Sequence, residues 1–212
     1  MTFTTITAEQ RSPEWKRARA GRVTGSRASD VLAMLKNGGE AAARRDYRLQ
    51  LVCERLTGEP QDSDFVNADM QRGIELEGEA RGAYEAATGM LVTEVGFLAA
   101  DDLLVGCSPD GLVDNGIIEL KVPRSATHLR NVRERVLPSD YLPQVTHNLW
   151  VTGAAFCDFV SYDPRFPEGL RLFRVRVQAT DVDIEGYAAK VRAFLDEVER
   201  DVEATLKLME AA

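Results

Sequence analysis

Hydrophobic residues recur at the spacing of an α-helix through most of this chain. Apolar positions three or four residues apart share one helix face, so each segment with this period is predicted to be helical. The predicted helices cover residues 12–22, 27–36, 41–56, 67–88, 125–136, 141–151 and 181–209. Pro13 suits a first helical turn, and Ser26 is a good N-cap for the helix that follows it. The last helix is long and amphipathic, so we expect it to close the core or to contact another subunit.

Shorter apolar or alternating runs between these helices predict β-strands. The predicted strands cover residues 103–107, 117–122, 155–162 and 170–178. Asp114-Asn115-Gly116 is typical of a tight turn, so we expect the first two strands to meet through it. Because side chains alternate across a strand, Glu119 and Lys121 project to one face and Leu120 to the other. The whole pattern predicts one α/β domain over residues 1–212.

Composition excludes several classes of protein. The chain has 212 residues, of which 44% are hydrophobic and 28% charged, and these are ordinary globular values. Its three cysteines are scattered, so neither a disulfide framework nor a zinc or iron–sulfur cluster is indicated. The first residues do not resemble a signal peptide and no segment has the length of a membrane span, so we expect a cytoplasmic protein.

The net charge of −8 argues against a surface that coats DNA, because non-specific affinity for nucleic acid comes mainly from neutralised phosphates. Any DNA must therefore meet a locally basic surface. Two groups of basic residues could supply one: Lys16, Arg17, Arg19, Arg22 and Arg27, and then Arg124, Arg130, Arg133 and Arg135. An alternative is that many of these side chains lie on solvated helix faces.

The candidate chemistry lies in the segment from Gly106 to Pro123, GCSPDGLVDNGIIELKVP. Asp110 and Glu119 would repel each other if held close together, and a divalent cation removes that repulsion. The two carboxylates, the backbone carbonyl of Leu120 and water suit the octahedral geometry of Mg²⁺. Lys121 could orient the attacking water or stabilise charge on a phosphate, which are parts of metal-assisted phosphodiester hydrolysis. The alternative is an exposed hairpin that carries a surface ion pair.

Three further positions are informative. The predicted helix start at Ser26 would present free N–H groups, and Arg19 could complete a phosphate site there, although such a start is more often only a cap. Of the three glutamates at 75, 77 and 79, only some can face inward, and Glu77 is a candidate to face a metal. His147 has no second ligand at suitable spacing, so we expect it to be a packed or partly exposed residue.

The spacing of Asp110, Glu119 and Lys121 resembles the PD-(D/E)xK nuclease signature. The wider chain resembles the lambda-exonuclease-like, YqaJ-like viral recombinase family of alkaline exonucleases. The motifs that carry this resemblance are WKRARAGRVTGS (15–26), RGIELEGEAR (72–81), CSPDGL (107–112), IELKVP (118–123), YLPQVTHNLWVTG (141–153) and SYDPR (161–165). The resemblance implies a restriction-endonuclease-like core, with a central mixed β-sheet flanked by helices.

The resemblance also implies roles for particular residues. Asp110, Glu119 and Lys121 would form the catalytic core, with Glu77 beside the metal, which is Mg²⁺ or Mn²⁺. Around the 5′-phosphate, the matching positions are Arg19, Ser26, Ser108 and Gln144. The implied activity is 5′→3′ degradation of one strand of linear double-stranded DNA, which leaves a 3′ single strand. The implied partners are other copies in a trimeric ring and a phage-type single-strand annealing protein, in a bacterial host with a phage or prophage.

Two other functions remain open at this point. An endonuclease of the same fold would share the metal site and differ in the topology of its substrate. A DNA-end-binding or scaffold protein that has lost catalysis would have no need of a repulsive carboxylate pair.

Overall fold

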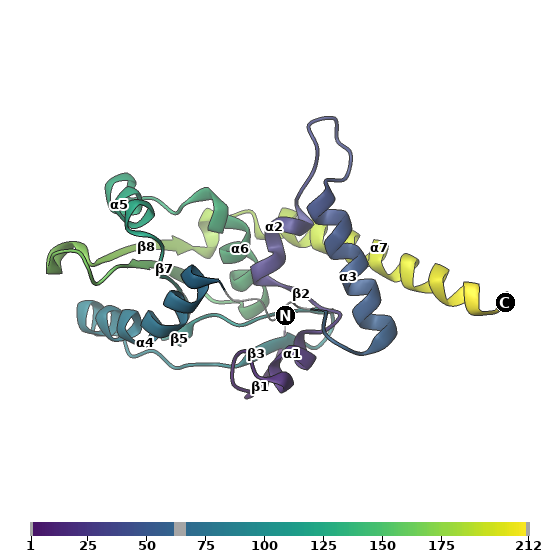
Figure 1. Ribbon diagram of the computed structural model, residues 1–212, viewed down its shortest axis with the longest axis horizontal. Helices are drawn as coiled ribbons and strands as arrows, with labels where there is room; N and C mark the ends of the chain where they lie inside the picture. The colour runs from purple at the N-terminus through teal and green to yellow at the C-terminus, as the bar shows by residue number, and fades with distance from the viewer. Residues whose placement is uncertain (1, 62–66, 211–212) are drawn as a thin grey trace.

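The computed structural model describes residues 2–61 and 67–210 of the chain. Within this part, the strands form two mixed four-stranded sheets flanked by helices (Figure 1). The predicted α/β fold class is therefore confirmed, with the strands divided between two sheets. No helix among these residues combines the length and apolar character needed to cross a membrane.

The first sheet has the order β1-β3-β4-β2. Its strands are β1 (Phe3–Ile6), β2 (Val23–Thr24), β3 (Phe97–Ala100) and β4 (Val105–Cys107). Among the described strands of this sheet, only β2 and β4 pair in parallel. The second sheet has the order β5-β6-β7-β8, with β6 and β7 parallel. Its strands are β5 (Gly111–Val113), β6 (Gly116–Lys121), β7 (Phe156–Tyr162) and β8 (Leu172–Gln178).

Seven α-helices and four short 3₁₀ turns surround the sheets in the described part of the chain. The helices are α1 (Pro13–Arg19), α2 (Ala28–Val31), α3 (Ala42–Thr57), α4 (Ala68–Thr88), α5 (Ser125–Glu134), α6 (Leu142–Thr152) and α7 (Ile184–Glu210). The 3₁₀ turns are η1 (Gly25–Arg27), η2 (Ser139–Tyr141), η3 (Glu168–Leu170) and η4 (Ala179–Asp181). Most predicted helices are found within a few residues of their expected bounds.

The helix predicted over residues 27–36 is wrong beyond its first turn. The helix α2 ends at Val31, and Ser26 lies inside η1 without capping α2, whose N-cap is Arg27. Core positions end at Leu32, because Val31 is buried and Leu32 packs against the core, whereas Leu35 is 52% exposed. The chain instead reverses, with the Leu35 N–H donating to the carbonyl of Gly39 at 2.8 Å.

The predicted hairpin also differs in its partner strand. The turn at Asp114 and Asn115 joins β5 to β6, whereas the upstream strand β4 belongs to the first sheet. Residues 108–110 carry the chain from one sheet to the other. Asp110 is therefore held where the two sheets meet.

Helices cover both faces of the second sheet, so β6 is buried on each side. On one face Ile118 and Leu120 pack with Tyr84 of α4, and on the other Ile117 packs with Val145 and Leu149 of α6. Glu119 shares the α6 face, as the alternation along the strand predicts. The alternative of an exposed hairpin is wrong, since only 1% of Glu119 is exposed.

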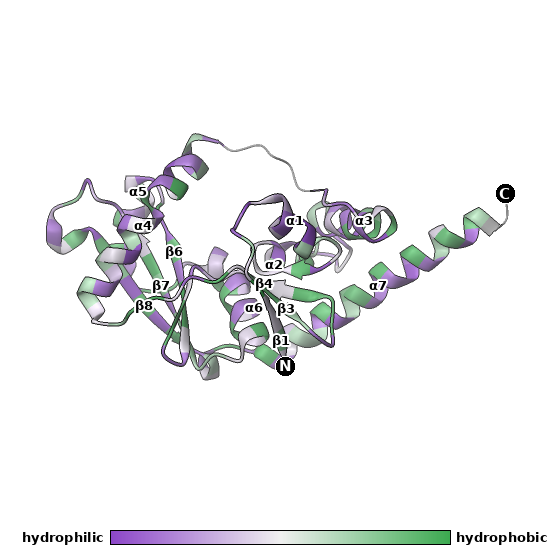
Figure 2. Ribbon diagram, turned by 90° about the horizontal axis from the view of Figure 1, so that it is seen from below, coloured by the Kyte–Doolittle hydropathy of each residue, from purple (hydrophilic) through white to green (hydrophobic). Residues whose placement is uncertain are grey.

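The long helix α7 packs against α3 and α6 in the core of the first sheet. Its buried side includes Val191, Phe194 and Val198, in keeping with its amphipathic pattern. Hydrophobic residues recur along α7 to its C-terminal end, which projects away from the sheets (Figures 1 and 2). Leu206 and Met209 are exposed there.

Candidate active site

The hairpin β5–β6 brings Asp110 beside Glu119 and Lys121. The Asp110 N–H donates to the carbonyl of Ile118 at 3.2 Å, and the Leu120 N–H donates to Asp110 Oδ2 at 2.6 Å. These bonds fix the Asp110 carboxyl against β6, ten residues later in the chain. The tight turn and the β ladder thus place the predicted acid pair together.

Glu119 is buried and is held by side chains from α6 as well as by its own strand. Gln144 Nε2 donates to Oε1 at 2.5 Å, and Asn148 Nδ2 donates to Oε2 at 3.0 Å. Lys121 forms an ion pair with the same carboxylate. Its two carboxylate oxygens thus accept hydrogen bonds from charged and amide donors. Glu119 is therefore locked in one orientation.

Asn148 was not among the residues predicted for the site. It lies one helical turn after Gln144, so both amides face β6 from the same side of α6, and this spacing is the signal that could have identified it. Its Oδ1 is buried with no hydrogen-bond partner, and a Cβ added to Gly25 would lie 2.2 Å from it. A side chain at position 25 would therefore displace the Asn148 amide that holds Glu119.

The charges of this cluster shift the pKa values of its members. Burial first, and then the charge of Glu119, raise the pKa of Asp110 to about 7. Partial burial disfavours the Lys121 ammonium, but the carboxylates of Glu119 and Asp110 outweigh it and raise the pKa of Lys121. The lysine is therefore a permanent cation near neutral pH. Its Nζ lies 5.5 Å from the ring centre of Tyr141.

Glu77 reaches this cluster from α4. Burial and the nearby charge of Asp110 raise the pKa of Glu77. Two arginines hold its carboxylate: Arg81 Nη2 donates to Oε1 at 3.0 Å, and Arg11 Nη2 lies 3.6 Å from Oε2. The inward orientation expected for Glu77 is found, and its nearest described cations are these arginines.

A second cluster forms around α1 and η1. Trp15 Nε1 donates to Ser108 Oγ at 2.9 Å, and the Arg19 guanidinium stacks 3.9 Å above the centre of the Trp15 ring. Arg19 Nη2 also donates to Ser26 Oγ at 3.3 Å. Trp15 was not predicted, although its position one turn before Arg19 on a short helix could have indicated it. Its ring orients both Arg19 and Ser108.

These residues line a small cavity of about 160 Å³. The four residues predicted to surround a 5′-phosphate, Arg19, Ser26, Ser108 and Gln144, all line it. Gln144 also donates to Glu119, so one wall of the cavity is shared with the carboxylate cluster. The structure thus joins the two groups of predicted residues into one continuous site.

A larger cleft of about 740 Å³ opens beside this cavity. Its lining includes Asp110, Lys121 and Glu77 together with Arg19 and Ser26. Five cations line the cleft against three carboxylates: Arg11, Lys16, Arg19, Arg27 and Lys121, and Asp69, Glu77 and Asp110. The acidic chain therefore has a locally basic cleft at this site.

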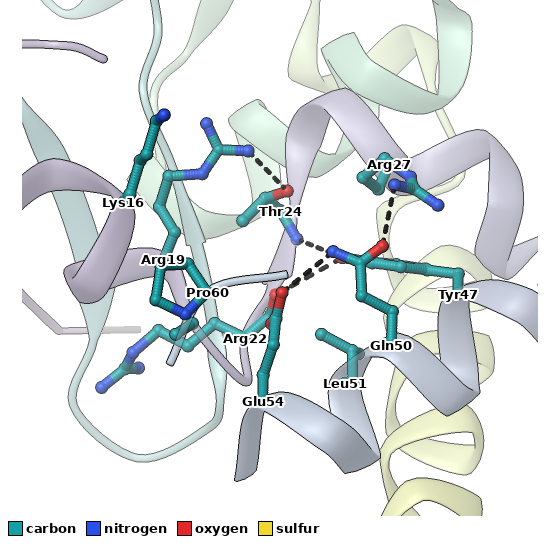
Figure 3. A pocket seen from close by; sticks show the side chains of 11 residues that line it. Lys16, Arg19, Arg22, Thr24, Arg27, Tyr47, Gln50, Leu51, Glu54 and Pro60 are labelled. Atoms are coloured by element: carbon teal, nitrogen blue, oxygen red, sulfur yellow. Dashed lines mark hydrogen bonds between the residues drawn. The ribbon is translucent and has the colours of Figure 1, made fainter. Parts of the chain in front are cut away.

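A buried carboxylate, Glu54, holds the turn that follows Arg19 at the end of α1 (Figure 3). Glu54 of α3 accepts hydrogen bonds from the Gly21 N–H at 2.7 Å and from Gln50 Nε2 at 2.9 Å. Gln50 in turn accepts from Arg27 Nη1 at 3.1 Å. The turn that follows α1 is thereby anchored to α3, so the side chains of Arg19 and Arg27 are presented from a supported backbone.

The donor set fits a divalent cation. The negative charge of Glu119 disfavours a second negative charge on Asp110, and a bound cation would remove this cost. Among the residues that the structure describes, no three His, Cys, Asp or Glu side chains gather at a spacing that would hold a metal. A cation here would accordingly use two carboxylates, a backbone carbonyl and water, which suits Mg²⁺.

His147 is buried away from this chemistry, as expected. Its Nδ1 lies 2.8 Å from the Tyr187 hydroxyl, and its Nε2 lies 3.0 Å from the carbonyl oxygen of Gly106. Burial lowers the pKa of His147 to about 4. It therefore packs as a neutral ring between α6, α7 and β4.

The fold and site define a protein of the restriction-endonuclease-like class, and comparison with known proteins assigns it to a family. The sequence profile of the YqaJ-like viral recombinase domain matches residues 14–155. The chain therefore belongs to the YqaJ-like viral recombinase family, and this membership supports a nuclease role. A search of curated proteins found no match to this chain.

Solved structures of exonucleases share the fold. An alkaline exonuclease from Laribacter hongkongensis, LHK-Exo, is 41% identical with a TM-score of 0.84, and the match covers 95% of this chain and 100% of that one. The same enzyme in complex with dAMP is 40% identical with a TM-score of 0.85 and the same coverage. A phage-related exonuclease from Haemophilus somnus 129PT is 15% identical with a TM-score of 0.65, over 89% of this chain and 96% of that one, and shows the fold alone.

Proposed function

We propose that this protein is a metal-dependent 5′→3′ exonuclease that degrades one strand of linear double-stranded DNA. The observation that carries the proposal is the small cavity that shares Gln144 with the carboxylate cluster. A cavity of about 160 Å³ has a volume that suits a terminal group such as a phosphate. Hydrolysis beside such a cavity would release one nucleotide at a time from an end, which favours an exonuclease over an endonuclease of the same fold.

The chemistry of the cavity favours a phosphate as that terminal group. Arg19 supplies a planar guanidinium, and Ser26 and Ser108 supply hydroxyl groups. Arginine with hydroxyl donors is a common combination for phosphate, since the guanidinium binds two oxygens at once. A 5′-phosphate in this cavity would set the first phosphodiester of the strand near Asp110 and Lys121.

The proposed mechanism is attack of water on that phosphodiester. Asp110, Glu119 and the carbonyl of Leu120 would hold a Mg²⁺ or Mn²⁺ ion, which when bound supplies Lewis-acid stabilisation and a more acidic water. Gln144 and Asn148 keep the Glu119 carboxylate in a single orientation. Lys121, a permanent cation at the wall of the cleft, stabilises negative charge that develops on the phosphate. Glu77, on α4, would assist as a further carboxylate beside the metal.

The substrate and partners belong to the same proposal. A basic cleft in a chain of net charge −8 suits a protein whose DNA meets only the site and the surface near it. A homotrimeric ring would confine the duplex to that surface. The 3′ single strand left by the reaction would be the substrate of a phage-type annealing protein, which places the activity in DNA recombination.

Nucleotide release from matched substrates tests the proposal. We expect release from a linear duplex with 5′-phosphates in Mg²⁺, much slower release from a 5′-hydroxyl duplex, no cutting of a closed circular plasmid, and no activity with a chelator. Cutting of the closed circle would identify an endonuclease instead. Binding to DNA ends without any metal-dependent release would identify an end-binding protein that lacks catalysis.

Replacing the lysine tests the mechanism separately from binding. Lys121→Ala is expected to lower nucleotide release by about 10²-fold to 10⁴-fold, because it removes a charge needed in the transition state. Its binding to 5′-phosphorylated ends in chelator should change far less. Lys190→Ala, an exposed lysine of α7, is the matched control and should keep wild-type activity. Full activity of Lys121→Ala, purified free of host nucleases, would contradict the mechanism.

A further inference from the structure

Arg11 lies at the meeting point of three cavities around the site. It lines the small cavity with Arg19 and Ser26, and it lines the large cleft with Asp110 and Lys121. It also lines a third cavity of about 290 Å³, together with Glu77 and Arg81. Arg11 thus borders both the cavity that holds the predicted phosphate-binding residues and the cleft that holds Asp110.

The backbone of Arg11 is held in a conformation that favours glycine. Its φ is +72°, and only two other non-glycine residues in the described part of the chain have a positive φ. Those two are Asp114 in a hairpin turn and Arg135 at a helix C-cap, where such values are common. Arg11 occupies the third position of a turn that the Ser12 N–H closes onto the carbonyl of Glu9 at 3.1 Å. A positive φ at this position of a turn favours glycine, so the chain places an arginine beside the candidate active site at a conformational cost.

The one ion pair described for Arg11 is loose. Its Nη2 lies 3.6 Å from Glu77 Oε2, which exceeds a normal hydrogen-bond length, and its side chain is 51% exposed. Glu77 has a closer partner in Arg81, at 3.0 Å. Glu77 would therefore stay paired with Arg81 if Arg11 moved away. Transfer of Arg11 from Glu77 to another anion should thus cost little free energy.

We propose that Arg11 is a specificity-determining residue that binds the 5′-terminal phosphate opposite Arg19, and that the phosphate displaces Arg11 from Glu77. This inference rests on the proposed 5′ exonuclease function. In the free protein Glu77 holds the guanidinium at the edge of the cavity. When a phosphorylated end enters, Arg11 turns to the phosphate, whose higher charge and several oxygens make it the stronger acceptor. Recognition of the end then changes the charges around Glu77, beside Asp110.

Binding without catalysis tests Arg11 directly. The probe is a DNA hairpin with one blunt end, carrying either a 5′-phosphate or a 5′-hydroxyl, and affinity is measured by fluorescence anisotropy in chelator. Arg11→Gly is expected to reduce the preference for the phosphorylated end about tenfold, which corresponds to one charge-assisted hydrogen bond. Arg11→Lys keeps the charge and should lose less of the preference. Arg45→Ala, an exposed arginine of α3 that lines none of the three cavities, is the control for loss of charge and should keep it.

A double-mutant cycle with Glu77 tests the exchange. Glu77→Gln removes the competing carboxylate, so it should increase the preference for the phosphorylated end when Arg11 is present. In Arg11→Gly/Glu77→Gln the increase should vanish, because no arginine remains to be released. An equal increase in both backgrounds would overturn the exchange.

Thermal unfolding distinguishes a functional arginine from a structural one. Glycine adopts a φ of +72° without strain, so Arg11→Gly should raise Tm by about 2 °C. Asp114→Gly relieves a similar backbone conformation outside the site and should leave the phosphate preference unchanged. A fall in Tm for Arg11→Gly, or an unchanged preference while the wild type prefers phosphate, would overturn the proposal. If the wild type itself shows neither preference nor nucleotide release, the proposed function fails instead.

Discussion

Single residues of this site owe their properties to the groups that surround them. Glu119 is a buried carboxylate with amide donors on both oxygens, whereas Asp110 accepts one backbone N–H and lies beside a second negative charge. The two acids of one motif therefore have different environments. Asp110 has a pKa raised to about 7, and its proton or a cation must balance the pair.

His147 provides a test of a buried neutral group. Its pKa is lowered from 6.5 to about 4. Between these pH values the imidazole is protonated in the unfolded chain but stays neutral in the folded protein. Stability should thus be lost as pH falls from about 6.5 toward 4, at roughly 1.4 kcal/mol per pH unit from this group. Urea unfolding at pH 7.5, 6.5, 5.5 and 5.0 measures the slope. His147→Gln should be less stable at pH 7.5 but less sensitive to acid, and an unchanged slope in this variant would contradict the assignment.

Secondary-structure elements position the site by close contact between backbones. The strand β4 must approach β3 closely, and a Cβ at Gly106 would lie 2.2 Å from the Phe97 ring and 2.7 Å from the carbonyl oxygen of Leu98. The residues that follow β4 carry Ser108 and Asp110 into the site. Any displacement of this strand would therefore move a hydroxyl and a carboxyl of the site together.

Two glycine substitutions test this packing. Gly106→Ala should lower the free energy of unfolding by roughly 2 kcal/mol, since its new methyl group overpacks a rigid region. Gly82→Ala is the matched control. It lies in an exposed part of α4 with no atom within 4 Å of the new Cβ, so it should raise the free energy of unfolding by about 1 kcal/mol. Chemical denaturation measures both, and equal stability of the two variants would contradict the packing argument.

The whole molecule places the site where its two sheets meet. Glu119 comes from the second sheet and Asp110 from the segment that joins the sheets, whereas the cavity with Arg19 and Ser26 comes from α1 and η1 beside the first. The helix α6 contacts β4, η1 and β7, so it joins both halves. A cation bound by Asp110 and Glu119 would add a further bond at this junction.

Cation binding should therefore be visible in thermal stability. We expect Mg²⁺ or Mn²⁺ to raise Tm by about 3 °C at pH 8 when its concentration is tenfold above Kd, because binding to the folded state alone stabilises it. Asp110→Asn should abolish the shift. Asp114→Asn changes an exposed carboxylate in the same hairpin and should keep it. Equal shifts in both variants would show that the ion binds elsewhere.

Much of the fold and site follows from local features of the sequence. Helix period, strand alternation and turn residues predicted α4, α6, α7 and the strands β7 and β8, since each depends on contacts between near neighbours. The short motif from Asp110 to Lys121 predicted the acid pair because one hairpin contains it. The helix start suggested Arg19 and Ser26, and family resemblance added Ser108 and Gln144, all of which the structure brings to a single cavity.

Other features depend on contacts between distant segments, which no local pattern encodes. The helix after Ser26 ends at Val31, and Leu35 beyond it meets no core, whereas β4 pairs with β3, where only a glycine at position 106 fits. Asn148, Trp15 and Arg11 join the site because α6, α1 and the turn before α1 converge on residues far along the chain. Sequence period reports which face of an element is buried, whereas tertiary packing alone decides which polar groups that face will meet.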